Sequence, residues 1–345
     1  MAESLLDAWA ISETGFPRTG GSADQLRFLV NYAVLAPSTH NTQPWLFKIG
    51  REKLELYADR TRRLAVGDPK DRELTMSCGA SLFHLRVAAR HFGYRDVVET
   101  FPSPENPDLL ARFGLNGPMA VAPEDDVLFQ AITRRRTNRL PFEARPVPES
   151  LLSALRVAVA EEGVWCHLVP SVKERDAVAE LVGAGAQRQL ADKQYRREIA
   201  GWMRSNWTGL RDGMPGYAMG LRGLTALLAP SFVRTFDTGQ AQGERDRRRA
   251  MSAPVLAVLG TESDTPQAWL AAGQAVARTL LRCRSEGVWA SFFNQVIEVD
   301  DLRSKLSGVV GRGGFPQLLL RLGYCSEVRP TPRRTTSEVL QGQEG

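Results

Sequence analysis

The sequence predicts an α+β fold made of two related halves, because helix-like and strand-like segments follow one another in the same order twice. In each half, a helix with an apolar stripe leads through a loop into a strand that begins with a tryptophan, at Trp45 and at Trp165. In each half, a later helix lies between two glycines that are 14 residues apart. This repetition of order and spacing indicates an internal duplication. The glycine pairs are Gly79 with Gly93 and Gly273 with Gly287.

The first half contains two helices and three strands after a weakly periodic lead-in, residues 1 to 23. Apolar residues at helical spacing predict the helices, and short apolar runs separated by turn-like residues predict the strands. Gly93 stands where a left-handed cap would end the second helix. The predicted elements are a helix from Leu26 to Pro37, strands over 46–50 and 53–59, a helix over about 73–92 and a strand over 95–102.

The second half repeats this order but is longer. Residues 150–170 predict a helix, a loop and a strand, and residues 273–287 predict the matching later helix. The distance from tryptophan to glycine is 34 residues in the first half and 108 in the second, so about 74 residues are added. We interpret a Gly-, Trp- and Met-rich range of about 203–250 as an inserted lid, with a peripheral elaboration as the alternative.

The composition limits the class of protein. Of the 345 residues, 43% are apolar and 24% are charged, which is ordinary for a globular chain. The formal charge of +5 gathers in basic runs at 134–136, 245–249 and 329–334, which suit a phosphate-bearing small molecule as well as a nucleic acid. No nucleic-acid-binding module accompanies them, so no nucleic-acid partner is expected. A salt-sensitive affinity for DNA or RNA would favour the opposite interpretation.

Other residue types carry less information. Four scattered cysteines and no signal-peptide pattern predict a reduced, cytoplasmic location. The longest apolar runs are too short to span a bilayer, so no membrane partner is expected. The four histidines show no metal-ligand spacing, so no metal site is predicted and each is interpreted as a surface or helix residue. They are His40, His84, His91 and His167.

The loop PSTHNTQPW at 37–45 carries unusually many polar side chains. Its hydroxyl and amide groups supply several hydrogen-bond donors and acceptors, and Pro37 and Pro44 limit the freedom of the backbone. Such a rigid polar rim suits a flat heteroaromatic ring. A helix-to-strand turn whose side chains only cap backbone groups is the alternative.

The segment RRTNR at 135–139 is the second motif. Arg135, Thr137 and Arg139 alternate, so in an extended segment their side chains would point to one side. Guanidinium groups bind phosphate as a bidentate fork, and a hydroxyl adds a neutral donor. A solvated basic face is the alternative.

Together the motifs resemble the signature of FMN-dependent nitroreductases, in which an RRSxR-like segment, a helix and PSxxNxQPW precede the first strand. In that family two subunits build each flavin site: one gives the arginine motif and a basic C-terminal tail, and the other gives the polar loop. Here residues 9–13 read WAISE where the first half should carry arginines, and the second half reads AEEGVW where it should carry the loop. This complementary loss resembles the Acg-type subfamily, fused pseudo-dimers with a lid over the flavin.

The resemblance implies a nitroreductase-like fold in which two pseudo-symmetric halves, 1–125 and 126–345, pack as an internal dimer around one FMN. The second half would carry the arginine motif, the lid and the basic tail. A single chain would then hold a complete site, and a homodimer stays possible.

The resemblance also implies the residues that bind FMN. The arginine motif would meet the phosphate and ribityl chain, the polar loop would contact the isoalloxazine ring, and the segment at 294–295 would present backbone groups to it. One of two arginines in the tail would close on the phosphate, and which one does so is open. No separate catalytic side chain is expected, because the flavin carries the electrons. The implied residues are Arg135, Thr137, Arg139, Pro37, Ser38, Thr39, Asn41, Gln43, Asn294, Gln295, Arg333 and Arg334.

The implied activity is reduction of a small nitroaromatic or quinone-type acceptor through FMN in a ping-pong cycle, with NAD(P)H as the electron donor. The alternative is a protein that stores or sequesters FMN under the lid. The sequence leaves open the physiological acceptor and the choice between NADH and NADPH.

Overall fold

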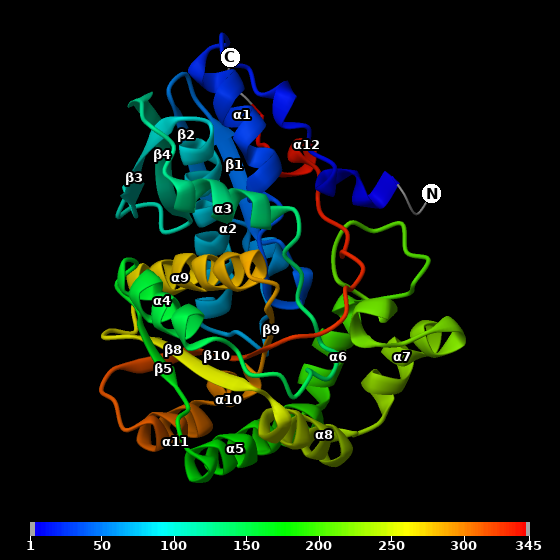
Figure 1. The fold of residues 1–345 in the computed structure, drawn as a ribbon. Coiled ribbons are helices and arrows are strands. Elements are labelled where there is room, and N and C mark those ends of the chain that lie inside the picture. Colours follow the sequence, from blue (N-terminus) through cyan, green and yellow to red (C-terminus); the bar gives the residue numbers. More distant parts are fainter. Residues whose placement is uncertain (1–3, 343–345) are drawn as a thin grey trace.

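The computed structural model describes residues 4 to 342, which form two four-stranded antiparallel sheets with two long helices between them (Figure 1). The helices are α2 (Arg72–His91) and α9 (Pro266–Ser285). The strand order is β1-β2-β4-β3 in the first sheet and β5-β8-β10-β9 in the second. The two orders correspond position for position, so one structural unit is present twice.

The first unit contains every helix and strand predicted for it. Gly93 ends α2 with a left-handed φ of 86°, as the sequence suggested. The structure adds β4, which pairs between β2 and β3 and which the sequence analysis missed, because its glycines and asparagine weaken the strand pattern. The other elements are α1 (Ser22–Ala33), β1 (Trp45–Ile49), β2 (Lys53–Ala58), β3 (Tyr94–Thr100), β4 (Leu109–Pro118) and α3 (Pro123–Ile132).

The second unit repeats this plan and has two additional helices, α10 and α11, between its strands β9 and β10. The predicted helix, loop and strand of 150–170 are present as α4 and β5. The elements are α4 (Glu149–Ala160), β5 (Trp165–Leu168), β8 (Val255–Thr261), β9 (Trp289–Phe292), α10 (Gln295–Glu298), α11 (Asp300–Val310) and β10 (Phe315–Gly323).

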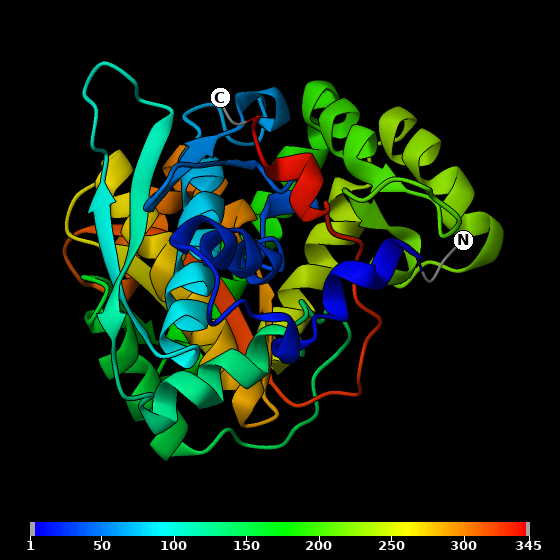
Figure 2. The same cartoon turned by 90° about the horizontal axis from the view of Figure 1, so that it is seen from above.

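The added segment lies between β5 and β8. Residues 50–52 join the first two strands of the first unit, whereas residues 169–254 join the corresponding strands of the second. α5 and α8 pack against each other below the second sheet, and α6 and α7 form a lobe at the side of the molecule (Figures 1 and 2). The segment contains α5 (Val172–Ala191), α6 (Lys193–Trp202), β6 (Met203–Arg204), β7 (Met214–Pro215), α7 (Gly223–Thr235) and α8 (Gly239–Ser252).

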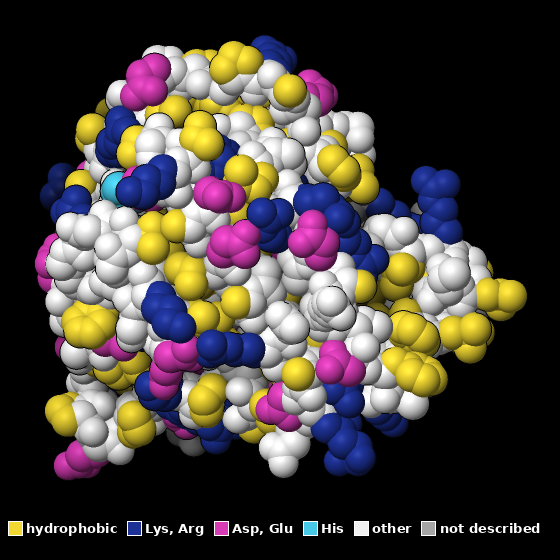
Figure 3. Space-filling view, turned by 90° about the horizontal axis from the view of Figure 1, so that it is seen from below, with side chains coloured by type: hydrophobic (Ala, Val, Ile, Leu, Met, Phe, Trp, Pro, Cys, Tyr) yellow, Lys and Arg dark blue, Asp and Glu magenta, His cyan; other side chains and the backbone are white. Residues whose placement is uncertain are grey.

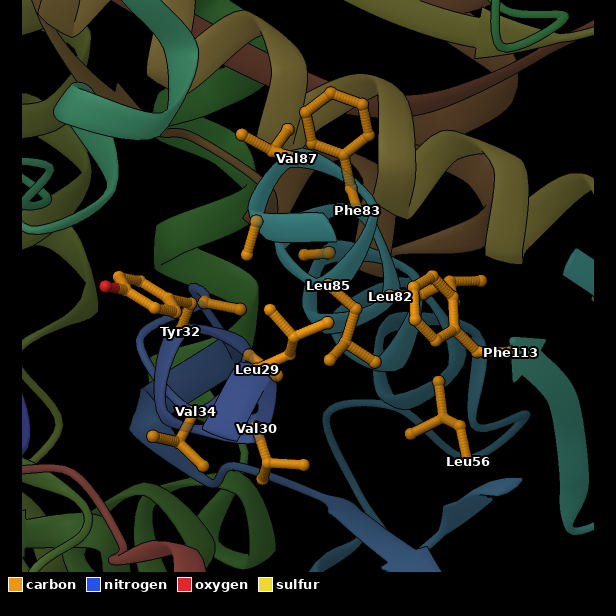
Figure 4. Close-up of a cluster of buried hydrophobic side chains, with 14 of the residues drawn as sticks. Leu29, Val30, Tyr32, Val34, Leu56, Leu82, Phe83, Leu85, Val87 and Phe113 are labelled. Carbon is orange, nitrogen blue, oxygen red and sulfur yellow. The ribbon is translucent and has the colours of Figure 1, made fainter. Parts of the chain in front are cut away.

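The largest core joins α1 to α2 and the first sheet. Leu26, Leu29 and Val30 lie on one face of α1 and are fully buried. Figure 4 shows Leu29 and Val30 of this face beside Leu85 of α2 in one apolar cluster. Burying a leucine side chain contributes about 1.5 to 3 kcal/mol, so this cluster fixes α1 and the loop that follows it.

After β10 the chain returns to the first sheet. Leu340 pairs in parallel with Phe47 at the outer edge of β1, and the N–H of Gln341 donates to the Phe47 carbonyl oxygen at 2.8 Å. α12 (Thr336–Val339) lies on this return. The tail that carries the predicted arginines is therefore held against the first unit. None of the described helices is both long and apolar enough to cross a bilayer.

α2 and α9 cross at a matched pair of glycines. A Cβ at Gly79 would lie 2.2 Å from the carbonyl oxygen of Leu270, and a Cβ at Gly273 would lie 2.0 Å from that of Met76. No side chain fits at either position, so the backbones of the two helices touch. The crossing therefore sets the separation of the two units.

Replacing Gly273 with alanine should push α2 and α9 apart. We expect a loss of about 1 to 3 kcal/mol in the free energy of unfolding, the usual cost of overpacking, measured by urea unfolding. Gly308→Ala is the matched control: Gly308 lies within α11 and nothing lies within 4 Å of an added Cβ, so no loss is expected there. Equal losses from both substitutions would contradict a tight crossing.

Candidate functional site

The polar loop at 37–45 has a constrained backbone. His40, Asn41 and Gln43 all have left-handed φ angles, at 51°, 58° and 52°. The N–H of Gln43 donates to the Ser38 hydroxyl at 2.9 Å, which closes the turn. Left-handed conformations at residues other than glycine cost free energy and cluster at functional sites.

The arginine motif follows α3 and joins the edge of the second sheet. Thr137 pairs in parallel with Ala290 of β9, and the N–H of Asn138 donates to the Ala290 carbonyl oxygen at 3.1 Å. From this edge Arg135 reaches the first unit, where its Nη2 donates to the carbonyl oxygen of Leu35 at 3.3 Å. The motif of one unit thus lies against the segment that leads into the polar loop of the other.

Arg135 is buried without a counter-ion. Only 2% of the residue is exposed, and its Nε and Nη1 have no hydrogen-bond partner among the described residues. Arg333 of the tail is also buried, and its Nε is likewise unpartnered there. Burial and the charge of Arg136 lower the pKa of Arg135 to about 9, and burial and the charge of Arg135 lower the pKa of Arg333. Neighbouring desolvated guanidinium groups with donors to spare suit an anion such as phosphate.

Trp9 supports these arginines. The guanidinium carbon of Arg136 lies 3.7 Å from the centroid of the indole ring, and that of Arg333 lies 4.9 Å from it. The indole N–H donates to the carbonyl oxygen of Thr331 at 2.9 Å. Residues 9–13, where the first half lacks the arginine motif, therefore supply an aromatic surface for these arginines. No sequence pattern predicted this role of Trp9.

The two arginines of the tail have different partners. A guanidinium nitrogen of Arg333 donates to the side-chain oxygen of Asn41 at 2.7 Å. Arg334 donates to the carbonyl oxygen of Gln43 at 3.1 Å and pairs with Asp59 at 3.3 Å. Because Arg334 already has a carboxylate partner, Arg333 is the one whose charge is free to meet an anion.

Glu73 of α2 connects segments from both units. Its carboxylate accepts from the Thr39 hydroxyl at 2.7 Å and from the Asn294 side-chain amide at 3.0 Å. It also pairs with Arg72 at 3.2 Å, and only 2% of Glu73 is exposed. This carboxylate therefore fixes the polar loop relative to the segment that follows β9. The sequence pattern predicted only that a helix begins near Glu73 and gave no sign of this contact.

His40 and Arg139 interact electrostatically across the two units. Burial lowers the pKa of His40 to about 4; Glu73 opposes this shift and Arg139 adds to it. His40 is therefore neutral near pH 7. Burial also lowers the pKa of Arg139, whose Nη1 donates to the carbonyl oxygen of Ala218 at 3.4 Å.

Glu298 of α10 shares a hydrogen bond with Glu73. Burial, followed by the charge of Glu73, raises the pKa of Glu298 well above its usual value. The side-chain amide of Gln189 donates to the same carboxyl group. Two adjacent carboxyl groups in a buried place cannot both ionise, so the pair retains a proton.

Gln295 points away from this junction. Its side-chain amide donates to Asp246 of α8 at 3.4 Å, and its carbonyl oxygen would lie 2.7 Å from a Cβ at Gly185 of α5. Gln295 therefore packs against the added segment, while Asn294 contacts Glu73. The other predicted residues lie on the loop, the arginine motif and the tail that meet at the junction: Pro37, Ser38, Thr39, Asn41, Gln43, Arg135, Thr137, Arg139, Arg333 and Arg334.

Part of the added segment, 203–219, covers the junction. The N–H of Gly213 donates to the Asn41 carbonyl oxygen at 3.2 Å, and the Asn41 side-chain amide donates back to the Gly213 carbonyl oxygen at 2.9 Å. The hydroxyl of Tyr217 donates to the carbonyl oxygen of Pro330 in the tail at 2.8 Å. The segment thus bonds to both the loop and the tail.

The symmetry-related position is filled by ion pairs. Arg278 of α9, which corresponds to His84 of α2 in the repeat, pairs with Glu162 at 2.7 Å. Glu162 also pairs with Arg86 at 2.8 Å, and the Arg278 and Glu162 side chains are each only 6% exposed. The charges at this symmetry-related position therefore neutralise one another. At the junction itself, the guanidinium groups of Arg135 and Arg333 keep unpartnered nitrogens among the described residues.

Sequence comparison identifies the family. No protein-family model matches the chain. It is 31% identical over 340 residues to "Putative NAD(P)H nitroreductase Rv3131" of Mycobacterium tuberculosis, covering 97% of this chain and 95% of the relative. It is 28% identical over 331 residues to "Putative NAD(P)H nitroreductase acg" of the same organism, covering 94% of this chain and 97% of that one.

Two repeated units that bring a polar loop against an arginine motif define a fused, two-unit class of α+β protein. The chain belongs to the NAD(P)H nitroreductase family, which confirms the resemblance found in its motifs. Among solved structures, FMN-dependent nitroreductase NfnB from Mycobacterium smegmatis in complex with NADPH has a TM-score of 0.42 and 15% identity, covering 64% of this chain and 99% of that chain. That likeness is too low to support an argument, so the assignment rests on the sequence relatives.

Replacing Arg135 with methionine removes a buried charge for which the described residues supply no carboxylate partner. We expect the ligand-free protein to become more stable by about 1 kcal/mol or more, because an apolar side chain of similar length avoids the desolvation cost. Added inorganic phosphate should stabilise the wild type but not the variant, as measured by thermal unfolding. Arg134→Met, at an exposed neighbouring position, should change neither property. A variant that keeps the full phosphate response would contradict an anion site at Arg135.

The proton held by Glu298 should give the stability a pH dependence of defined sign. Because its pKa is raised in the folded protein above the ordinary value of 4.5, the folded state keeps a proton that the unfolded chain loses. The free energy of unfolding should therefore fall as the pH rises from about 4.5 towards neutrality. Glu298→Gln should flatten this slope, measured by urea unfolding across that range, and Glu105→Gln in an exposed loop should not. An unchanged slope in Glu298→Gln would argue against a retained proton.

Proposed function

We propose that Arg135 and Arg333 hold the phosphate of one FMN, and that the chain reduces a small acceptor with electrons from NAD(P)H. The observation that carries the proposal is the unpartnered, buried donors of these two arginines. A phosphate would accept from those nitrogens and supply the missing counter-charge. The relatives are named putative NAD(P)H nitroreductases, and FMN is the cofactor that the resemblance of the motifs implies.

The remaining residues would position the flavin ring. We assign Thr39, Asn41 and Arg139 to the ring and its ribityl chain, with the backbone near Asn294 on the other side. Glu73 would act through Thr39 and Asn294, because it bonds to both. When bound, FMN would supply the chemistry by taking a hydride from the donor and passing it on.

Gln43 and Arg334 would hold the site together without touching the ring. The side-chain oxygen of Gln43 accepts from the N–H of Arg334 at 2.7 Å, and its side-chain amide donates to the Arg211 carbonyl oxygen at 2.8 Å. Both ends of the Gln43 side chain are therefore bonded to protein. These contacts tie the polar loop to the tail and to the segment above it.

A small nitroaromatic or quinone is the acceptor class that we propose. Loop, tail and covering segment crowd the junction, so donor and acceptor would take turns at one exposed face of the ring. This order of binding is a ping-pong cycle. Neutral His40 and the positive Arg139 would give that face a polar edge, and the positive charge of Arg139 would favour a reduced, negatively charged ring.

FMN storage is the second candidate, and the covering segment favours it. Asn41 and Arg139, both assigned to the flavin, bond directly to Gly213 and Ala218 of that segment. If these bonds persist with FMN bound, the nicotinamide of a donor could not stack on the ring. The protein would then retain flavin with little turnover.

The absorption spectrum and NAD(P)H oxidation by the FMN-loaded protein test these alternatives. We expect flavin absorption and oxidation of NAD(P)H that depends on an added nitroaromatic or quinone. Tyr217→Phe removes the bond between the covering segment and Pro330 and should raise the rate if access is limiting. Flavin retention without turnover in both proteins would support storage. A colourless protein that takes up no FMN would overturn both proposals.

We further propose that the two units act as the halves of an internal dimer, with one FMN per chain; the boundary expected between residues 125 and 126 falls within α3, which contacts both α2 and α9. The ion pairs of Arg278 at the symmetry-related position support a single site. We expect no nucleic-acid role: Arg247 and Arg249 in the basic run of α8 pair with Glu180 and Asp246.

A further inference from the structure

Exposed apolar side chains gather on the lobe that contains α7. Figure 3 shows them on the projecting lobe at the right of the view. Their exposed fractions run from 51% to 71%, whereas other exposed large apolar residues of the described chain are scattered. A contiguous exposed apolar face is typical of a docking surface. The five residues of this α7 face are Leu224, Leu227, Leu228, Phe232 and Phe236, while Trp207 and Leu210 are exposed on the preceding loop.

The packing of α7 directs this face outward. Leu224, Leu227 and Leu228 share one side of the helix, while Ala226 on the opposite side is buried. Ala226 sits against Gly216 so closely that a Cβ on Gly216 would lie 2.4 Å from the Ala226 Cβ. The small residue Ala226 therefore makes the internal contact of α7, and its large apolar side chains are exposed to solvent.

The charged residues within the stretch that carries the α7 face, 213–236, are all basic. No aspartate or glutamate occurs between Asp212 and Asp237, while Arg222 and Arg234 lie exposed at the two ends of α7. An apolar helix face flanked by basic residues complements a surface of anionic lipid headgroups. Two copies pairing through the same face would bring the same arginines together.

We infer that the α7 face docks on an anionic lipid surface. The helix lies in the plane of the headgroups, with the leucine and phenylalanine side chains among the acyl chains and Arg222 and Arg234 at the level of the phosphates. This mode of binding needs no membrane-spanning segment. The lack of long apolar runs, from which no membrane partner was expected, therefore does not bear on it. The inference does not depend on flavin binding.

The test is sedimentation of the full chain with vesicles of two compositions. We expect binding to an equimolar mixture of phosphatidylglycerol and phosphatidylcholine, and much weaker binding to phosphatidylcholine alone. Leu227→Glu should weaken binding about tenfold, because it removes apolar contact and adds a repelled charge. Arg234→Gln should weaken it about fivefold, the contribution of one basic residue near an anionic surface.

Val157→Glu is the matched control, because Val157 is 66% exposed on α4, outside the lobe. It should bind vesicles as the wild type does. Circular dichroism of each variant shows whether the fold is kept, and Arg234→Gln is a second probe that leaves the apolar face intact. Equal binding to both vesicle types, or equal loss in Val157→Glu, would overturn the inference. So would self-association that Leu227→Glu abolishes in a protein that binds neither vesicle.

Discussion

The close crossing of α2 and α9 is the constraint on which the rest of the structure depends. With only hydrogen at Gly79 and Gly273, the backbones of the two helices touch and the two sheets take one fixed separation. That separation brings together two motifs that lie about a hundred residues apart in the chain. Glu73, less than two turns before Gly79 on α2, then links Thr39 of one unit to Asn294 of the other. The geometry of the site is thus set by the helix interface rather than by the loops alone.

The two pseudo-symmetric positions resolve the same electrostatic problem in opposite ways. Around Arg135 the fold keeps desolvated positive charge whose Nε and Nη1 find no partner among residues 4–342, which disfavours the ligand-free protein and favours a bound anion. Around Arg278 the chain supplies its own carboxylate, which removes both the cost and the capacity to bind. A duplicated protein can therefore specialise one position for binding and use the other for internal cohesion.

The sequence predicted the features that depend on local pattern. Tryptophan and glycine spacing revealed the repeat, and apolar periodicity revealed α1, α2, α4 and α9 with the strands β1, β2, β3 and β5. The sequence did not predict features that depend on the direction in which a side chain points. Trp9 lies in no motif, Gln295 turns towards α8 while Asn294 turns towards Glu73, and Arg334 reaches Asp59 while Arg333 lies beside Trp9. β4 was missed because glycines interrupt its alternation, although its two neighbours supply all its pairing.

The return of the tail to the first sheet has a consequence for assembly during synthesis. Arg333 and Arg334 follow every other predicted site residue in chain order, and Leu340, which pairs with Phe47, lies beyond the last strand of both sheets. A growing chain therefore has both units before it has a finished binding site, and its β1 edge is unpaired for that time. Docking of residues 333–341 shields this edge and completes the arginine cluster in one step, which makes retention of an anion depend on the docked tail.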